Sequence, residues 1–529
     1  MLASAFLPQT CGFIAGRWVP DSAADRAPII NPATGELLAE VPVMGPAEAV
    51  AAVEAADRFL AAGTTLEQRR GWLTAMAEQI LAARHELGRI ITLEHGKPLK
   101  EGIGEVEYSA GFFQTCAESL DHLRPHALPQ TVRGCRWTVH HRPAGVAGLI
   151  TPWNFPLAML AKKLSAAIGA GCGIVIKPAS QTPLSAIAAV AIAERVGVPA
   201  GMVNLVIGPA SPIGQVFCEH PAVRIISFTG STEVGKKLMA AVAPHVKRLA
   251  LELGGNAPFI VFEDADIEAA ANHLIANKFR AGGQTCVCAN RVYVHRRIHD
   301  AFVDAVAERV RKLKVGNGLE PDTDIGPLIN RDAFDKVAAH VQDAVQRGAR
   351  LIVGGQARRP EQDWGAFYPP TVLTGITPEM LVCREETFGP VIAVSCFDDE
   401  GDEETCLPHR RDAGAKREGG QDARPPIGEQ EVCPPMGRGG RSAEEAVIEA
   451  ANSTPYGLAA YVFTGDAARA ERVAARLAFG HVGVNTGSGP TPEAPFGGMK
   501  QSGFGREGGV EGLLEFTEPQ TVATAGNEN

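Results

Sequence analysis

A cysteine in a glycine-rich loop is the side chain of this sequence best suited to covalent chemistry. The loop Gly282-Gly-Gln-Thr-Cys-Val-Cys-Ala-Asn290 contains Cys286 and Cys288. Its glycines offer exposure and close backbone N–H groups, which cysteines that only fill a core lack. A free thiol with a pKa of about 8.5 is only about 3% thiolate at pH 7, so a nearby base or helix end is needed. The alternative of an inert small residue fits Cys288 better than Cys286.

A carboxylate at the end of an apolar strand is the second chemical signal. Leu251-Glu-Leu-Gly-Gly-Asn256 places Glu252 in apolar surroundings, followed by two glycines. Burying a carboxylate is costly unless the group is paired or used. Desolvation raises the pKa of such a group toward that of a general base working near neutral pH.

Two further polar signals follow apolar runs. In Thr151-Pro-Trp-Asn-Phe-Pro156 the amide of Asn154 either donates to a ligand oxygen or caps the next helix, and the residues alone favour the cap. In Ile176-Lys-Pro-Ala-Ser180, Lys177 and Ser180 either hold ribose hydroxyls or a phosphate, or belong to a solvated loop. Neither pattern decides between its alternatives.

Two more segments suit parts of a nucleotide. Ser227-Phe-Thr-Gly-Ser-Thr-Glu-Val-Gly235 runs from a strand through a glycine turn into a helix with Ser231 near its start. The free N–H groups of that helix suit a pyrophosphate, although the G-x-G-x-x-G fingerprint is absent. Glu385-Glu-Thr-Phe-Gly-Pro390 combines carboxylates that can hold ribose hydroxyls with an aromatic ring that can stack on a flat ligand. A solvated acidic turn is its alternative.

The elements that position these signals are predicted to alternate between strand and helix. The strands expected in the first half are Val146–Thr151, Gly173–Lys177, Val203–Val206, Arg224–Phe228 and Arg248–Leu251. Helices are expected to begin near Pro156, Pro183, Pro212 and Ser231. Repeated βα units of this kind build a parallel sheet covered by helices on both faces, so the fold class is α/β. Ligands bind such sheets at the carboxyl ends of the strands, where the signals lie.

The flanking regions extend this organisation. Long helices are expected from Ala47 to Leu120, followed by a strand at Arg136–His140. A second α/β region is expected to begin with a strand at Ala257–Phe262, a helix at Asp266–Phe279 and a strand at Arg291–His295. The chain is expected to close with a strand at Glu515–Ala525.

Composition limits the classes of function. With 529 residues the chain needs more than one domain, and its 45% hydrophobic and 21% charged residues are ordinary for a globular protein. A net charge of -10 disfavours nucleic acid and anionic membranes. Eleven scattered cysteines, an odd number, indicate reduced thiols. We find no secretory signal, membrane span or zinc-binding pattern, so we expect a cytoplasmic protein without a metal.

One segment departs from the globular pattern. Residues 398–441 begin with an acidic run and continue as a stretch rich in Pro, Gly and Arg, with almost no apolar residues. Such a segment cannot offset the entropy of ordering, so we interpret it as a disordered surface insertion. A regulatory or anion-binding role for its arginines is the alternative.

Taken in order, these motifs resemble those of the aldehyde dehydrogenase superfamily, and most of all NAD(P)-dependent succinate-semialdehyde dehydrogenases. The similarity runs from Phe13-Ile-Ala-Gly-Arg-Trp18 through Ala494-Pro-Phe-Gly-Gly498 to Gly503-Phe-Gly-Arg-Glu-Gly508. It implies a five-stranded variant Rossmann domain, an α/β catalytic domain and a small β oligomerisation arm in a homodimer or homotetramer. The implied boundaries are 12–122 and 143–252 for the cofactor domain, 253–511 for the catalytic domain, and 123–142 and 512–529 for the arm.

The resemblance also implies a role for each signal. Cys286 would attack the aldehyde carbon, the Asn154 amide and the Cys286 backbone N–H would hold the oxyanion, and Glu252 would activate the water that releases the acid. Lys177 and Ser180 would contact the adenosine ribose of NAD or NADP. Ser231 would bind the pyrophosphate and Glu386 the nicotinamide ribose. The full set of implied cofactor positions is Trp153, Lys177, Ser180, Gly230, Ser231, Leu253, Glu386 and Phe388.

Departures from the family pattern refine this reading. NAD-specific relatives often carry a Glu at the position of Ser180, so Ser180 beside Lys177 favours acceptance of NADP. Arg280 matches one cation that would bind a substrate carboxylate, whereas Lys162 stands where an Arg is expected and loses the bidentate fork. The insertion 398–441 has no counterpart and is expected to loop out, with an impaired enzyme as the alternative. A disulfide between Cys286 and Cys288 could act as a redox switch.

Other classes of function remain open from the sequence. Another semialdehyde or an aromatic aldehyde could be the substrate. An acylating dehydrogenase would use coenzyme A, but Glu252 favours water as the acceptor. A thiol hydrolase would need Cys286 alone, and a catalytically silent binding protein has only the insertion in its favour.

Overall fold

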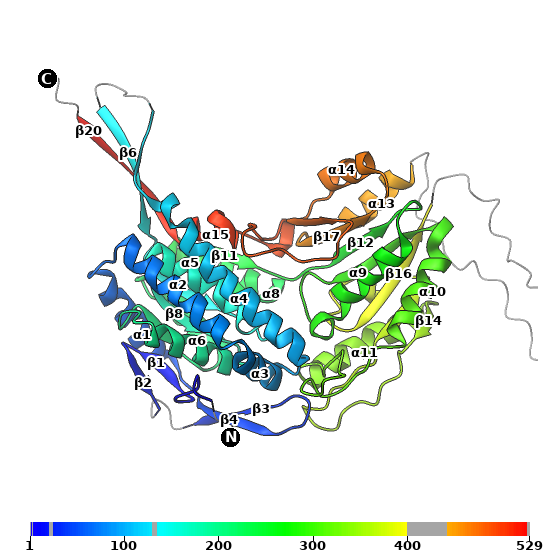
Figure 1. Cartoon of the computed structure of the whole chain (residues 1–529), viewed down its shortest axis with the longest axis horizontal. Helices are drawn as coiled ribbons and strands as arrows, with labels where there is room; N and C mark the ends of the chain where they lie inside the picture. The colour runs from blue at the N-terminus through cyan, green and yellow to red at the C-terminus, as the bar shows by residue number, and fades with distance from the viewer. Residues whose placement is uncertain (1, 3, 21–24, 130–134, 399–441, 526–529) are drawn as a thin grey trace, which may run out of the picture.

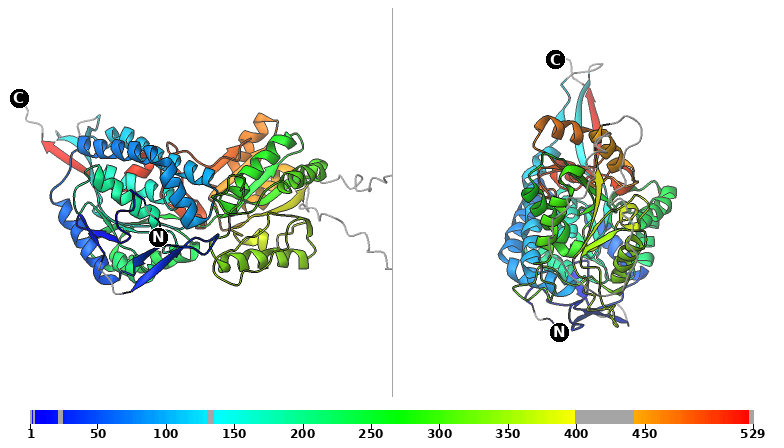
Figure 2. Two further views of the ribbon diagram at one scale, coloured as in Figure 1. Left: turned by 60° about the horizontal axis from the view of Figure 1, so that its bottom comes forward. Right: turned by 90° about the vertical axis from the view of Figure 1, so that its right-hand side faces the viewer.

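The computed structural model describes residues 2, 4–20, 25–129, 135–398 and 442–525. Its helices and strands form two lobes, each built around one sheet, and a narrow third sheet projects from the first lobe (Figures 1 and 2). The predicted insertion 398–441, apart from Asp398, lies outside the described residues. Among the described helices, none combines the length and the apolar character needed to cross a membrane.

The first lobe contains an eight-stranded sheet in the order β19-β11-β10-β7-β8-β9-β1-β2. Its centre is parallel and consists of β7 (Val146–Ile150), β8 (Gly173–Lys177), β9 (Val203–Leu205), β10 (Val223–Thr229) and β11 (Arg248–Glu252). These are the five strands that the sequence predicts. Three antiparallel strands that it does not predict extend the edges: β1 (Gly12–Ile14), β2 (Arg17–Val19) and β19 (Gly503–Phe504).

Helices cover both faces of this sheet because its strand order reverses. The chain passes from β7 to β8 and β9 on one side, and then returns to β10 and β11 on the other. Right-handed crossovers therefore put the first two connecting helices on one face and the next two on the opposite face. They are α5 (Ala158–Ala170), α6 (Leu184–Arg195), α7 (Ala210–Glu219) and α8 (Thr232–Val242).

The N-terminal helices complete the two layers. On one face, α1 packs against β8 and α7, and glycines allow the close approach: a Cβ on Gly173 would lie 2.4 Å from the Ala56 carbonyl oxygen. On the other face, α2 and α4 pack against α5, and α3 packs against α6. The helices are α1 (Pro46–Leu60), α2 (Leu66–Ala82), α3 (Arg84–His95) and α4 (Leu99–Ser119), in agreement with the predicted helical region. A separate hairpin precedes them, formed by β3 (Arg26–Ile30) and β4 (Leu37–Pro42).

The second lobe surrounds a seven-stranded sheet in the order β14-β15-β16-β13-β12-β17-β18, which is parallel except for β14. Its strands are β12 (Ala257–Val261), β13 (Ala289–His295), β14 (Arg350–Val353), β15 (Thr371–Thr374), β16 (Val391–Phe397), β17 (Ala459–Phe463) and β18 (His481–Val484). Its helices are α9 (Ile267–Phe279), α10 (His299–Val310), α11 (Arg331–Gln346), α12 (Leu381–Arg384), α13 (Ala443–Asn452) and α14 (Ala467–Arg476). The Ser442 hydroxyl caps α13, as expected for a helix that begins at this point.

A three-stranded antiparallel sheet projects from the first lobe (Figure 1). It consists of β5 (His126–Ala127), β6 (Cys135–Pro143) and β20 (Thr517–Ala525), and β20 follows the short helix α15 (Gly509–Leu514). Both predicted strands of the arm are therefore present. The domain boundaries stay a prediction, and β19, inside the predicted catalytic range 253–511, pairs with β11 of the first sheet.

Candidate active site

The predicted signals of the first lobe lie at one edge of its sheet. Thr151 follows β7, Lys177 ends β8, Gly230 follows β10 and Glu252 ends β11. Because these strands are parallel, their carboxyl ends meet at the same edge. The strand order reverses between β7 and β10, which is where sheets of this kind bind ligands.

The loop that carries Cys286 reaches this edge from the second lobe. After α9 the backbone turns through three residues at positive φ, Ala281 (51°), Gly282 (64°) and Gly283 (75°). A Cβ on Gly283 would lie 2.2 Å from the Gly389 carbonyl oxygen, so glycine is required there. On the facing segment a Cβ on Gly255 would lie 2.1 Å from the Cys286 carbonyl oxygen. The glycines after Glu252 therefore let the two segments approach.

Asn154 faces the cysteine loop. Its side-chain Nδ2 donates a hydrogen bond of 2.9 Å to the carbonyl oxygen of Gln284, two residues before Cys286. The capping interpretation is wrong, because α5 has no side-chain cap at its N-cap residue, Leu157. Its first N–H groups instead donate to the carboxylate of Glu105 on α4. The Asn154 amide is therefore directed to the loop that carries Cys286.

Glu252 is buried without a hydrogen-bond partner among the described residues. Its side chain is 5% exposed, and neither carboxylate oxygen is hydrogen-bonded. Burial, and then the charge of Glu507, raise its pKa well above the ordinary value, while Lys162 and Lys163 act in the opposite direction. A buried carboxylate without a partner is rare in folded proteins and fits a group kept available for proton transfer.

A pair of lysines and a second glutamate stand next to Glu252, and sequence reasoning missed two of the three. Lys163 Nζ hydrogen-bonds to Ser227 Oγ at 3.0 Å and forms a very short contact with Glu507. Lys162 Nζ lies 3.9 Å from the other oxygen of Glu507. Lys163 and Glu507 are the two residues that were missed. Two adjacent lysines inside an otherwise apolar helix are costly to bury without an acidic partner, and this pattern could have indicated both Lys163 and the need for a carboxylate nearby.

The Cys286 thiol is half-buried, and two carboxylates, those of Glu386 and Glu252, act on it. Burial, and then the nearby Glu386, raise its pKa to about 12, although Lys162 opposes them. Cys288 is directed elsewhere: its sulfur lies 3.4 Å from the Gly283 carbonyl oxygen and 3.5 Å from Lys278 Nζ. Both cysteines are free thiols, and the redox switch between them stays a prediction.

Lys177 and Ser180 lie at the end of β8, as predicted. Lys177 is 3% exposed, and burial alone lowers its pKa to about 8, with no acidic side chain among the described residues acting on it. The exposed Ser180 donates a hydrogen bond of 3.4 Å to the Gly208 carbonyl oxygen. A buried ammonium without an anionic partner fits a ligand that brings hydroxyl groups or a phosphate.

The turn after β10 lies beside these residues along the sheet edge. Ser231 caps α8 by accepting a hydrogen bond of 3.3 Å from the Val234 N–H, which leaves other N–H groups of the first turn available. Gly230 donates to the Glu252 carbonyl at 3.0 Å. Leu253 packs on Gly235, where a Cβ would lie 2.6 Å from the leucine side chain. This arrangement is suited to an anionic group at the start of α8.

Glu386 and two aromatic rings border the cysteine loop from the other side. Glu386 accepts a hydrogen bond of 3.0 Å from the Gly255 N–H, and burial raises its pKa to about 7. Phe388 has a positive φ of 57°, and its ring lies edge-on to that of Trp153 at 5.6 Å. These groups offer a carboxylate and an aromatic wall next to Cys286.

The two predicted substrate cations differ in their surroundings. Lys162 is buried, and its ammonium lies near three aromatic rings, those of Phe496 (4.7 Å), Phe112 (5.5 Å) and Tyr108 (5.8 Å). Arg280 is exposed, with its guanidinium 5.2 Å from the centre of the Phe155 ring. Arg280 forms no ion pair within the described ranges, whereas Lys162 is already close to Glu507.

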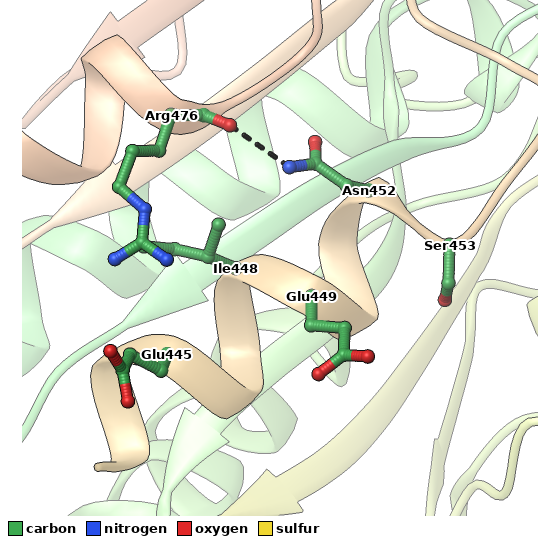
Figure 3. Close-up of a pocket in the computed structure, with 6 residues that line it drawn as sticks. All are labelled: Glu445, Ile448, Glu449, Asn452, Ser453 and Arg476. Atoms are coloured by element: carbon green, nitrogen blue, oxygen red, sulfur yellow. Dashed lines mark hydrogen bonds between the residues drawn. The ribbon is translucent and has the colours of Figure 1, made fainter. Parts of the chain in front are cut away.

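A surface groove in the second lobe lies apart from these residues (Figure 3). It is formed by α13, the residue that follows it and the end of α14, and is lined by Glu445, Ile448, Glu449, Asn452, Ser453 and Arg476. The Asn452 amide donates to the Arg476 carbonyl oxygen at 2.9 Å and ties the two helices together. None of the predicted site residues lines this groove.

Comparisons with known proteins agree with the geometry. A model of the aldehyde dehydrogenase family matches residues 18–405 and 440–522, so part of the predicted insertion falls outside the match. The chain is 43% identical to a mitochondrial succinate-semialdehyde dehydrogenase of Arabidopsis thaliana, over 98% of this chain and 90% of that protein. It is 40% identical to a glutarate-semialdehyde dehydrogenase of Pseudomonas aeruginosa, over 99% of both. A crystal structure of succinate-semialdehyde dehydrogenase from Burkholderia pseudomallei matches with a TM-score of 0.88 and 42% identity, over 99% of both chains.

The raised pKa of the Cys286 thiol predicts how it reacts with an alkylating agent. Because the pKa is about 12 in the cofactor-free protein, the rate of iodoacetamide labelling at this residue should rise about tenfold for each pH unit from about pH 7 to 9.5. Mass spectrometry of the peptide that contains Cys286 measures this rate. A plateau below about pH 9 would show a lower pKa and contradict the prediction.

Proposed function

The chain belongs to the aldehyde dehydrogenase family, and we propose that it oxidises a carboxylate-bearing semialdehyde, such as succinic semialdehyde, to the acid with NAD or NADP. The observation that carries this proposal is the convergence of three groups from three elements. The Asn154 amide bonds the backbone two residues before Cys286, and the unpaired carboxylate of Glu252 acts electrostatically on the Cys286 thiol. A nucleophile, an oxyanion donor and a base are the groups that the reaction needs.

In the proposed mechanism the Cys286 thiol gives up its proton to water, and the resulting thiolate adds to the aldehyde carbon to form a thiohemiacetal whose oxygen carries the negative charge. The Asn154 amide and the Cys286 backbone N–H donate hydrogen bonds to its oxyanion, where preorganised donors are most effective. The nicotinamide cofactor supplies the hydride acceptor when it is bound, and the product on the protein is a thioester of Cys286. Glu252 then takes a proton from the water that attacks the thioester, which frees the carboxylic acid and the thiol.

The raised pKa of Glu252 limits the pH range in which this residue can act as the base. Glu252 must be ionised to act as a base, and its pKa is raised by burial and by Glu507. Lys162 and Lys163 keep that shift smaller, because they favour the charged form. The lysine pair therefore supports the base electrostatically, and activity should fall as the pH drops through the raised pKa of Glu252.

The cofactor is proposed to lie along the edge of the first sheet. Lys177 and Ser180 contact the adenosine ribose, Gly230 and Ser231 the pyrophosphate, and Glu386 the nicotinamide ribose. Trp153, Leu253 and Phe388 line the remaining walls. The fit rests on the buried, unpaired Lys177 and on the free N–H groups at the start of α8. Ser180 places no negative charge near a 2′-phosphate, which favours acceptance of NADP.

The preference for a carboxylated aldehyde is assigned mainly to Arg280. Its guanidinium is exposed, packs on the Phe155 ring and has no ion-pair partner among the described residues. Lys162 contributes less, because it lies near Glu507. The relatives named for succinate and glutarate semialdehydes act on substrates with a distal carboxylate, which supports this substrate class.

We further propose a homodimer or homotetramer in the cytoplasm. The arm presents two edge strands, β5 and β20, whose backbone groups on the outer side are open to pairing with another chain. The β20 side chains after Thr517 are exposed along the whole strand. Among the described residues, seven cysteines are free thiols, which fits a reducing compartment: Cys116, Cys135, Cys172, Cys218, Cys286, Cys288 and Cys383.

Turnover of two matched aldehydes tests the function. We expect kcat/KM for succinic semialdehyde to exceed that for butanal, and Arg280→Met to lower only the former by about 10- to 100-fold, the value of a charge-assisted hydrogen bond. Absorbance at 340 nm with NAD and with NADP measures both. Arg58→Met, which replaces a surface arginine paired with Glu54, is the control. Equal turnover of both aldehydes would contradict the substrate class, and no turnover would indicate an enzyme impaired by the insertion.

The role of Glu252 predicts a separation of two steps. In Glu252→Gln, hydride transfer should still occur once per active site, but release of the acid should slow by about 10²- to 10⁴-fold, the range of general-base catalysis. A rapid burst of about one reduced cofactor per subunit, followed by slow turnover, is the expected signal in stopped-flow absorbance. Loss of the burst together with the steady rate would contradict a role limited to the second step.

Position 180 predicts the choice of cofactor. Ser180→Glu should lower kcat/KM with NADP by more than about tenfold, because a carboxylate repels the 2′-phosphate at close range. The value with NAD should change much less. Ser180→Ala separates the effect of charge from that of the lost hydroxyl, and equal losses with both cofactors in Ser180→Glu would contradict the proposed contact.

A further inference from the structure

A buried lysine that the proposed mechanism does not use lies behind Asn154. Lys97, in the link between α3 and α4, is 1% exposed. Its ammonium donates to Glu105 Oε2 at 2.6 Å and to the backbone carbonyl of Asn154 at 2.8 Å. It also lies 3.7 Å from the centre of the Phe155 ring. One side chain thus contacts the backbone of Asn154 and the ring of its neighbour.

Glu105 holds the same segment from the other end. Its second oxygen accepts hydrogen bonds from the N–H groups of Leu157 (2.9 Å) and Ala158 (3.1 Å), where α5 begins. The side chains of Lys97 and Glu105 are both fully buried. The segment from Asn154 to Ala158 is therefore fixed at its first carbonyl by Lys97 and at its last N–H groups by Glu105.

The buried ion pair of Lys97 and Glu105 is not needed for packing alone, because apolar side chains could fill the same volume. Removing two charges from water costs several kcal/mol for each ion, and apolar residues of similar size are often as stable. The geometry here satisfies both oxygens of Glu105 and gives Lys97 two oxygen acceptors and an aromatic face. What the ion pair adds over an apolar filling is a defined position for the backbone of Asn154.

The next turn of α4 reaches the cysteine loop. Glu101 lies four residues before Glu105 and so shares its face of the helix. Glu101 Oε2 accepts a hydrogen bond of 2.7 Å from the Ala281 N–H, at the positive-φ turn that precedes Cys286. A single helix face therefore contacts both the segment of the oxyanion donor and the loop of the nucleophile.

We propose that Lys97, paired with Glu105, is a positioning residue that sets the place of the Asn154 amide relative to Cys286. This inference rests on the proposed role of Asn154 as an oxyanion donor. Such a donor is effective only within about 2.7–3.1 Å of the developing charge. A displacement of about 1 Å can cost about 10²-fold in rate. Lys97 acts on the carbonyl of the same residue whose amide donates.

A double-mutant cycle tests the inference. Lys97→Met should lower kcat by about 10- to 100-fold, whereas KM for the cofactor should stay within about twofold. Asn154→Ala should lower kcat by about 10²- to 10³-fold. If Lys97 acts through Asn154, the double variant should be no slower than Asn154→Ala, within about twofold. Losses that multiply would overturn the inference.

Two further variants separate positioning from folding. Lys100→Met removes a surface lysine at the start of α4, three residues after Lys97 and paired with Asp324, and should leave kcat unchanged. Glu105→Gln keeps an oxygen acceptor for α5 but weakens the hold on Lys97, so it should give a smaller loss that also disappears in the Asn154→Ala background. Iodoacetamide labelling of Cys286 should proceed at the parent rate in Lys97→Met, because that reaction needs no oxyanion donor.

The outcomes distinguish this inference from the function on which it rests. Full activity of Asn154→Ala would remove the oxyanion role itself and the inference with it. A slow Asn154→Ala together with a fully active Lys97→Met would leave the proposed function standing and overturn only the positioning role. A change in the labelling rate of Cys286 equal to the loss in kcat would assign Lys97 to the stability of the whole site instead.

Discussion

The buried start of α5 imposes the constraint on which the active site depends. The first N–H groups of a helix have no partner within the helix, and at a buried start they must find one elsewhere. The residue before α5 offers no side-chain cap, and Glu105 on α4 takes that role. Glu94 on α3 does the same for the neighbouring helix α6 through the N–H groups of Leu184 and Ser185. Because α5 is capped from outside, the Asn154 amide is free to face the loop that carries Cys286.

Charge balance around Cys286 is the second organising feature. Burial and the charge of Glu507 disfavour the ionised form of Glu252, whereas Lys162 and Lys163, which both lie close to Glu507, favour it. Lys162 also favours the thiolate form of Cys286, whereas burial and the charge of Glu386 disfavour it. Glu252 and Cys286 are therefore electrostatically coupled, both through Lys162 and through the effect of Glu252 on the thiol.

The sequence predicted the parts of the fold that depend on local pattern. The five buried strands and four connecting helices have apolar runs of their own, and their observed bounds lie close to the predicted ones. Strands β1, β2 and β19 have only two or three residues. Strand β1 joins the sheet through the distant strand β9 and β19 joins it through β11, whereas β2 pairs with its neighbour β1, so no local pattern reveals their place in this sheet. The capping interpretation of Asn154 was wrong for a similar reason. Asn before a helix is expected to cap it, but here Glu105, which is distant in sequence, accepts the hydrogen bonds of the first N–H groups and makes such a cap unnecessary. Lys97 and Glu101 carry no sequence signal, because charged residues at a helix start are usually solvated.

The two cations near the site illustrate how context decides a residue's use. Both Lys162 and Arg280 carry a positive charge, but Lys162 is enclosed by aromatic rings and lies 3.9 Å from Glu507. A substrate carboxylate that approached Lys162 would compete with Glu507 and weaken the support that the lysine gives to Glu252. Arg280 forms no ion pair with these groups, and its guanidinium lies 5.2 Å from the centre of the Phe155 ring. If the proposed function holds, selectivity for an anionic aldehyde would change at Arg280 without disturbing Glu252, whereas a change at Lys162 would affect selectivity and catalysis together.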